Sequence, residues 1–148
     1  MTTQATTTSN WAQDARWLEE QVQAVQFMLG TTLSNEMKSQ LSNAVMDLDY
    51  TNGMVISYAV TVRNSAAYTI EDVQGNRRVL QTITNAASDL AKQVEKRQAC
   101  VDKLLLLLTV AMPVPANADA HIAGDVREHR TSIANTICER AAQRTVQQ

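Results

Sequence analysis

Apolar side chains recur at alternating steps of three and four residues in four segments of this 148-residue chain. An α-helix turns once in about 3.6 residues, so this spacing places apolar side chains along one face of a helix, whereas a half-buried strand would show strict alternation. The pattern is strongest between Leu80 and Leu108. It predicts an all-α protein with four amphipathic helices, at residues 10–29, 34–64, 69–111 and 118–145.

Turn-forming residues are scarce. The chain has 4 Gly and 2 Pro, which favours a few long elements over many short strands. The predicted connections near residues 31–33, 64–68 and 112–117 are short, so successive helices should be antiparallel neighbours. We expect an up-down-up-down four-helix bundle with long second and third helices. It forms a single domain over residues 9–148, after a flexible, Thr-rich N-terminus at residues 1–8.

One stretch has two interpretations. Residues 49–62 contain Asn52-Gly53 and a run of β-branched side chains, a combination typical of a β-hairpin. The three-four spacing nevertheless passes through Asn52-Gly53 without a change of phase, which favours a helix that Gly53 weakens. The sequence alone leaves both alternatives open, with the helix favoured.

The predicted helices differ in length, and this leaves two apolar ends. The third would be about 60 Å long and the first about 30 Å, so each end of the bundle would be a two-helix hairpin. One end holds the uncharged stretch 52–61, and the other holds five consecutive leucines at 104–108, which a hairpin cannot bury. In the alternative, the third helix breaks and the chain folds back over both ends. The expected interface residues are Met54, Val55, Ile56, Tyr58, Leu104, Leu105, Leu107 and Leu108.

Two different apolar ends on one subunit would generate rings or open filaments when copies associate. The favoured hypothesis is therefore a non-catalytic structural protein that self-assembles as a homo-oligomer into a coat, shell or filament. The alternative is an adaptor or secretion-type chaperone that holds a helix of a partner protein. A metal-binding helical bundle is the second alternative. The three hypotheses predict, in turn, polymers of this chain alone, a monomer or dimer that takes a partner, and bound metal.

Arg97 interrupts the apolar face of the third predicted helix. A buried guanidinium needs a partner, because an uncompensated buried charge is strongly destabilising. Folding the chain at its short connections brings Arg97 near Glu36 and His129, which predicts a polar layer or an anion site there. His121, Asp125 and His129 lie four residues apart on the fourth predicted helix. Because the two histidines are more than two turns apart, one ion does not readily reach both, and no metal site is assigned.

Other functional classes find little support. The sequence has no P-loop, no Gly-rich dinucleotide turn and no nucleophile–base arrangement, so neither enzyme activity nor a cofactor is predicted. A net charge of −2 and few aromatic side chains argue against nucleic-acid binding, although the fourth predicted helix carries several arginines. Cys100 and Cys138 lack metal-ligand spacing and are expected to be reduced. With no span and no signal peptide, we expect a soluble protein inside the cell or within an assembled particle.

Overall fold

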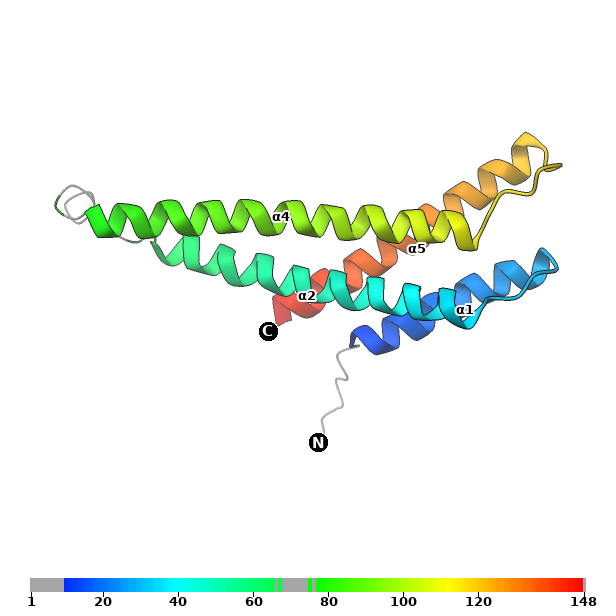
Figure 1. The fold of residues 1–148 in the computed structure, drawn as a ribbon, viewed down its shortest axis with the longest axis horizontal. Helices are drawn as coiled ribbons and strands as arrows, with labels where there is room; N and C mark the ends of the chain where they lie inside the picture. Colours follow the sequence, from blue (N-terminus) through cyan, green and yellow to red (C-terminus); the bar gives the residue numbers. More distant parts are fainter. Residues whose placement is uncertain (1–9, 66, 68–74, 76, 148) are drawn as a thin grey trace, which may run out of the picture.

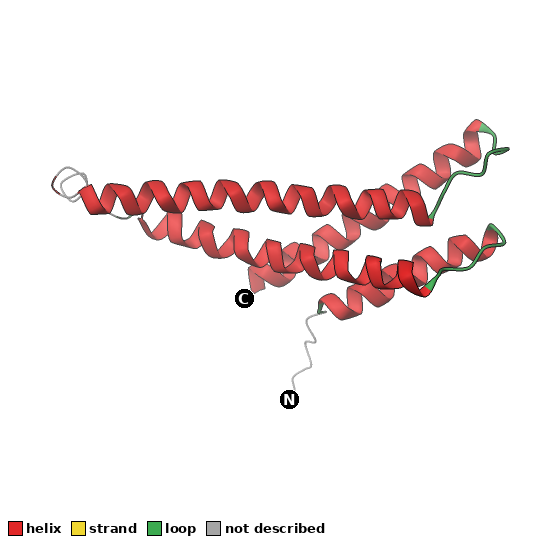
Figure 2. Ribbon diagram, viewed as in Figure 1, coloured by secondary structure: helices red, strands yellow, loops and turns green. Residues whose placement is uncertain are grey.

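The structure, a computed structural model, describes residues 10–65, 67, 75 and 77–147. Within these residues every regular element is an α-helix, and no strand is present (Figure 2). The helices pack as a bundle, as the periodicity predicts, and the second and third in chain order are the longest, with 31 and 35 residues. The four helices of the described chain are α1 (Trp11–Met28), α2 (Asn35–Ser65), α4 (Arg77–Ala111) and α5 (Ala120–Gln147) (Figure 1).

Two predicted segments lie outside the described residues. They are the Thr-rich N-terminus at residues 1–8 and the start of the third predicted helix at residues 69–74. No helix in the described part of the chain is long and apolar enough to cross a membrane.

The helix ends follow from local capping residues. Asn10 begins α1 with a capping box, in which its side chain accepts from the Gln13 backbone N–H and the Gln13 side chain accepts in return. Gly30 follows the end of α1 with a φ of 75°, the left-handed conformation that glycine adopts without strain. Asp119 caps α5, where its Oδ1 accepts from the Ile122 N–H at 2.9 Å.

Residues 49–62, for which a hairpin was the alternative, lie inside α2. Leu48 and Val55, two turns apart, are both buried, so the helix keeps its apolar face on either side of Gly53. The Thr51 hydroxyl donates to the Asp47 carbonyl at 2.7 Å, which satisfies this buried side chain within the helix. Burial of this face outweighs the turn preference of the Asn-Gly pair.

Gly53 offers a direct test of this helix. A Cβ added at Gly53 meets no atom within 4 Å, so Gly53→Ala should stabilise the protein by about 0.5–1 kcal/mol because alanine loses less backbone entropy in a helix. Thermal unfolding followed by circular dichroism should show a higher Tm. Gly30→Ala is the control of opposite sign, because its positive φ strains any Cβ. A lower Tm for Gly53→Ala would contradict a regular helix at this position.

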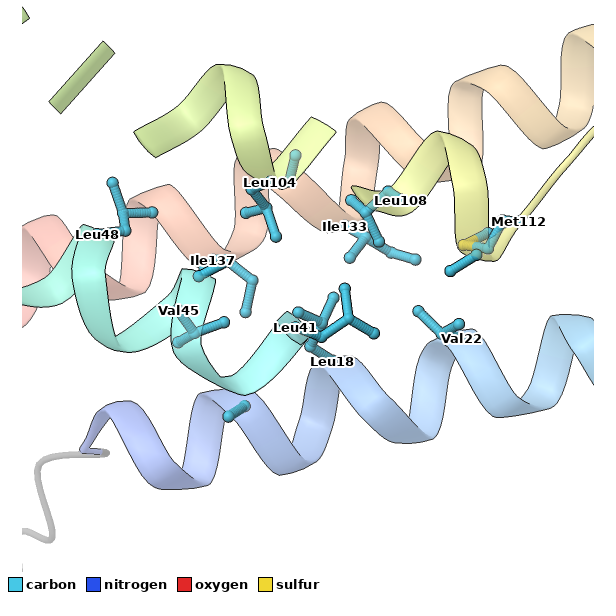
Figure 3. Packing of buried hydrophobic residues seen from close by; sticks show 14 residues of the cluster. Leu18, Val22, Leu41, Val45, Leu48, Leu104, Leu108, Met112, Ile133 and Ile137 are labelled. Carbon is cyan, nitrogen blue, oxygen red and sulfur yellow. The ribbon is translucent and has the colours of Figure 1, made fainter. Parts of the chain in front are cut away.

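All four helices contribute to one hydrophobic core. The side chains point into the space between the helices (Figure 3), and each helix contributes buried residues from its apolar row. In α4 these buried residues come from the C-terminal part of the helix. The largest of them are Leu18, Val22, Leu41, Val45, Leu48, Leu104, Leu108, Met112, Ile133 and Ile137.

The run of five leucines is part of this core, contrary to our expectation of an exposed end. Leu104 and Leu108 are 0% exposed, because α1, α2 and α5 all pack against this part of α4. Two side chains from other helices also donate hydrogen bonds to backbone carbonyls at the end of α4. Gln26 of α1 donates from Nε2 to the Ala111 carbonyl at 2.7 Å, and Arg130 of α5 donates from Nε to the next carbonyl, at 2.9 Å. These bonds satisfy carbonyls that a helix end leaves without partners.

The register between α2 and α4 explains the difference. Thr51 lies against Cys100, and Asn52 lies against Arg97. At this register the last turns of α4 lie beside the first turns of α2, which α1 also covers. The short connection that we expected near residues 64–68 would instead have carried the end of α4 beyond the start of α2 and left it uncovered.

The opposite end of the bundle does project. Figure 1 shows α2 and α4 side by side, running in opposite directions, and extending past the first residue of α1 and the last residue of α5. We call this two-helix extension the arm. It comprises residues 52–65 of α2 and residues 77–97 of α4.

Candidate functional site

The arm carries apolar side chains that the rest of the described chain leaves exposed. Ile56 and Val60 in α2 are 36% and 38% exposed, and Leu80 and Val94 in α4 are 50% and 39% exposed. Ala87, midway between Leu80 and Val94, is exposed as well. A spacing of seven residues is close to two helical turns, so these three α4 side chains form one row.

The rows on the two helices lie on the same side of the arm. The buried seam between the helices runs through Val55 in α2 and Ala86 in α4. Ile56 and Ala87 each come directly after a seam residue, and one residue rotates a helix by about 100°. In two antiparallel helices that face each other, this rotation turns both rows to the same side. The arm therefore has one apolar face, which we define as Ile56, Val60, Leu80, Ala87 and Val94.

This arm face continues the surface on which α5 packs. Asp49, seven residues before Ile56, is bound by Arg144 of α5. Val101, seven residues after Val94, packs against the hydrophobic core. The same side of the α2–α4 pair is thus covered near the core and uncovered along the arm.

The predicted interface residues in α2 occupy different environments. Ile56 belongs to the arm face, whereas Val55 is buried in the seam, at 7% exposure. Met54 and Tyr58 are half-buried. Val60, which lies in the uncharged stretch 52–61 that was expected to form an apolar end, also belongs to the arm face.

The predicted interface leucines mostly face inward. Leu104 and Leu108 are in the core, and Leu105 and Leu107 are half-buried against it. The exposed member of the run is Leu106, at 64%. Four of the five leucines are at least half-buried because α1, α2 and α5 pack against this part of α4, and Leu106 lies on the side that these helices leave open.

A buried ion-pair network joins three helices near the base of the arm. Asp14 in α1 is 0% exposed, and both carboxylate oxygens are bonded: Arg144 donates to Oδ2, and Arg140 Nη1 donates to Oδ1 at 3.4 Å. Arg144 also donates from Nε and Nη2 to Asp49 Oδ1 in α2, at 2.9 and 2.6 Å. The Arg140 guanidinium carbon lies 4.5 Å from the centre of the Trp17 ring, a cation–π contact. The network ties α5 to both α1 and α2.

The two carboxylates keep Arg144 charged despite its burial. Burial is the largest single influence on its pKa and lowers it, but hydrogen bonds to Asp49 and Asp14 and their negative charges together raise the pKa above its ordinary value. A buried ion pair with its hydrogen bonds made adds little net stability over apolar packing, yet it strongly penalises arrangements that separate the partners. The network therefore selects one relative position of α1, α2 and α5.

The amino-acid sequence does carry a signal for this network, although Asp14 and Arg144 were not among the expected site residues. Asp14 lies four residues before Leu18 of the first apolar row, and Arg144 lies seven residues after Ile137 of the fourth. A charged residue on an apolar row is the same signal that singled out Arg97.

Arg97 belongs to a polar layer, with partners other than those expected. Its Nη1 donates to Asn52 Oδ1 at 3.5 Å, and beside it Thr51 Oγ1 lies 3.6 Å from Cys100 Sγ. Glu36 is exposed and lies sixteen residues before Asn52 in α2, about 24 Å along the helix. The structure therefore does not bring Glu36 to Arg97.

His129 also lies away from Arg97. Arg97 is instead close enough to Cys138 of α5 for its charge to act on that thiol. The pKa of Cys138 is raised overall, because burial and the negative charge of Glu139 raise it more than the positive charge of Arg97 lowers it. His129 is nine residues before Cys138 in α5 and lines an apolar groove between α1 and α5. The groove has a volume of about 410 Å³ and is lined by Ala24, Val25, Met28, Met112, Asp125, Val126 and His129.

The remaining histidine makes one contact with a carboxylate. His121 Nε2 lies 3.6 Å from Asp125 Oδ2, and both side chains are exposed on α5. Within the part of the chain that the structure describes, no group of three or more His, Cys, Asp and Glu side chains is placed to hold a metal ion.

Comparisons with known proteins identified no relative of this chain. No protein-family model matches the chain, and no curated protein or solved structure matches it significantly.

Proposed function

We propose that this chain is a non-catalytic structural protein, an up-down-up-down helical bundle that self-assembles through its arm to build a coat, shell or filament. The observation that carries the proposal is the arm face. Surface apolar residues are ordinary when scattered singly, but rows on two adjacent helices that share one side form a continuous patch, and such patches are typical of interfaces. A net charge of −2 gives little repulsion between copies.

The charge distribution on the arm supports the same function. Between Leu80 and Val94, the charged residues of α4 are Asp89 and Lys92. Their positions in the helical rotation place them off the row that contains Leu80, Ala87 and Val94. Arg63 of α2, seven residues after Ile56, is exposed on the same side, so the absence of charge holds for the α4 row. Depletion of charge is characteristic of surfaces that become buried between proteins.

Charged substitutions on the arm face test this function. Leu80→Glu combined with Val94→Glu should prevent association, because assembly would have to desolvate two carboxylates per chain without partners. Light scattering over a range of concentrations measures the molar mass. We expect the wild-type mass to rise with concentration and the variant to stay at the 16.3 kDa of one chain.

Leu106→Glu is the matched control, since it also replaces an exposed leucine of α4 but lies off the arm. It should assemble like the wild type. A wild-type chain that stays at 16.3 kDa at every concentration would contradict self-assembly.

A second candidate function is a partner-binding module, and the groove between α1 and α5 favours it. Its lining is mainly apolar, and Met28 at its edge is 80% exposed. Grooves of this kind accept the apolar side chains of a partner helix. This candidate predicts a chain of constant mass that gains stability when the partner is added.

A further inference from the structure

We infer that the groove between α1 and α5 is a binding site for a small molecule that carries an ammonium group on an apolar body, such as an alkyl or arylalkyl amine. The groove lies at the end of the bundle opposite the arm (Figure 1). Binding there is therefore independent of the proposed self-assembly.

The groove has the dimensions of a small-molecule site. Its volume of about 410 Å³ falls within the range of about 300–1,000 Å³ that such sites occupy. Its helical lining spans one turn of each helix, at residues 24–28 of α1 and 125–129 of α5, which is about 6 Å along each axis. A partner helix docks through side chains on successive turns. The groove would hold one anchor of such a helix, whereas a compact molecule can fill it completely.

The floor and both walls of the groove are fixed by the fold. Met112, at the floor, is 0% exposed. Gln26 of α1 and Arg130 of α5 donate hydrogen bonds to the carbonyls of Ala111 and Met112, at 2.7 and 2.9 Å, so both walls are tied to the end of α4. A site that is formed before binding loses less conformational entropy when a ligand enters. Met28, at the rim, is 80% exposed, and its flexible thioether can pack over the bound molecule.

A single acid gives the groove its charge. The neighbouring helix ends and loops, residues 21–35 and 104–118, contain no charged residue. Among the residues that line the groove, Asp125 is the acid, and none is a lysine or arginine. The contact of Asp125 Oδ2 with His121 Nε2, at 3.6 Å, is longer than a hydrogen bond, so the carboxylate is open to another donor. A carboxylate at the mouth of an apolar groove favours a cationic ligand and disfavours an anionic one.

His129 places a second polar group on the same wall. It lies one turn after Asp125 in α5 and is half-buried. An ammonium group has three donors, so it can bond to the carboxylate and to an imidazole nitrogen while the rest of the ligand packs on the apolar lining. Arg130 does not line the groove, since its Nε–H is directed to the Met112 carbonyl. The apolar lining consists of Ala24, Val25, Met28, Met112 and Val126.

NMR spectroscopy of the full chain, isotope-labelled at the methionine methyl groups, tests this site. Met28 and Met112 line the groove, whereas Met46 and Met54 lie in α2, away from it. Titration with phenethylammonium should shift the Met28 and Met112 signals with a Kd in the millimolar range and leave the other two unchanged. The neutral analogue phenethyl alcohol should bind about 2–5-fold more weakly, the gain expected from an exposed ion pair. The anionic analogue phenylpropionate should bind more weakly still.

Three variants assign the recognition to named groups. Asp125→Asn should bind phenethylammonium and phenethyl alcohol equally. Asp102→Asn is the matched control: it removes an exposed aspartate of α4 that does not line the groove, and it should keep the preference for the ammonium. Ala24→Leu should abolish the shifts with every probe, because the larger side chain occupies the groove. Ala24 is exposed, so this variant leaves the core intact, as circular dichroism should verify.

Several results would overturn the inference. No shift of the Met28 and Met112 signals at any soluble concentration of phenethylammonium would reject the site. Equal shifts of all four methionine signals would show adventitious association. Equal affinity of the wild type for the ammonium and the alcohol, or an unchanged preference in Asp125→Asn, would reject recognition of an ammonium by Asp125. None of these outcomes bears on self-assembly, which light scattering measures separately.

Discussion

Replacing Asp14 with alanine is expected to lower the free energy of unfolding by about 3–5 kcal/mol, the cost of leaving a buried charge without its partner. Asp14 is fully buried and bonded to both Arg144 and Arg140. Without it, Arg144 keeps only Asp49, which is partly exposed. Urea unfolding followed by circular dichroism measures the loss as a lower denaturation midpoint.

Two variants separate the network from a general effect of removing charge. Asp47→Ala removes an exposed aspartate of α2 and should change stability by less than about 0.5 kcal/mol. The double variant Asp14→Leu with Arg144→Met removes both buried charges. Its loss of unfolding free energy should therefore be smaller than the sum of the losses of the single variants Asp14→Leu and Arg144→Met. An Asp14→Ala chain as stable as the wild type would mean that Asp14 is solvated rather than buried.

Leu108→Ala is expected to cost about 2–5 kcal/mol, because it removes a fully packed side chain and leaves a cavity among four helices. Leu106→Ala, two residues away in the same run of leucines, should cost less than about 0.5 kcal/mol because Leu106 is largely exposed. Urea unfolding of the two variants in parallel gives the comparison. The sequence around the two positions is nearly the same, so the difference measures tertiary cover alone.

A loss of stability for Leu108→Ala no larger than that for Leu106→Ala would contradict the observed register of α4 against α2. At the register first expected from the sequence, the leucine run protruded as part of a two-helix end, and no leucine of the run would have a full set of neighbours. Equal and small losses at Leu106 and Leu108 would support that arrangement. A large loss at Leu108 alone supports the observed one.

The register between α2 and α4 places the leucine run in the core and leaves the arm face exposed. Four of the eight expected interface residues lie in the leucine run at 104–108, and two of those are fully enclosed. The surface that we propose for association is therefore the arm face, and other exposed apolar side chains of the described chain, such as Phe27 and Met28, lie off the arm. If two copies met only through this face, the assembly would close as a dimer, whereas open filaments need two different complementary surfaces. A larger assembly would need a second contact, and the groove between α1 and α5 is at the other end of the molecule (Figure 1).

The helices themselves were predictable from the sequence, because the information that forms them is local. The three-four spacing of apolar residues marked all four, and the ends of α1 depend on local residues, the N-cap Asn10 and the glycine Gly30. Even the Asn52-Gly53 pair did not mislead, since the apolar face of α2 kept its phase through it. An interaction between residues three or four apart depends little on the rest of the chain.

How the helices slide against one another was decided only by the tertiary structure. Apolar rows that repeat every three and a half residues fit a facing row at several registers, displaced by whole pairs of turns and similar in buried area. The choice among them comes from contacts between residues far apart in the sequence: Asp14 with Arg144, and Asn52 with Arg97. Those contacts bury the leucine run and leave the arm face open, and no local pattern in the sequence distinguishes one from the other.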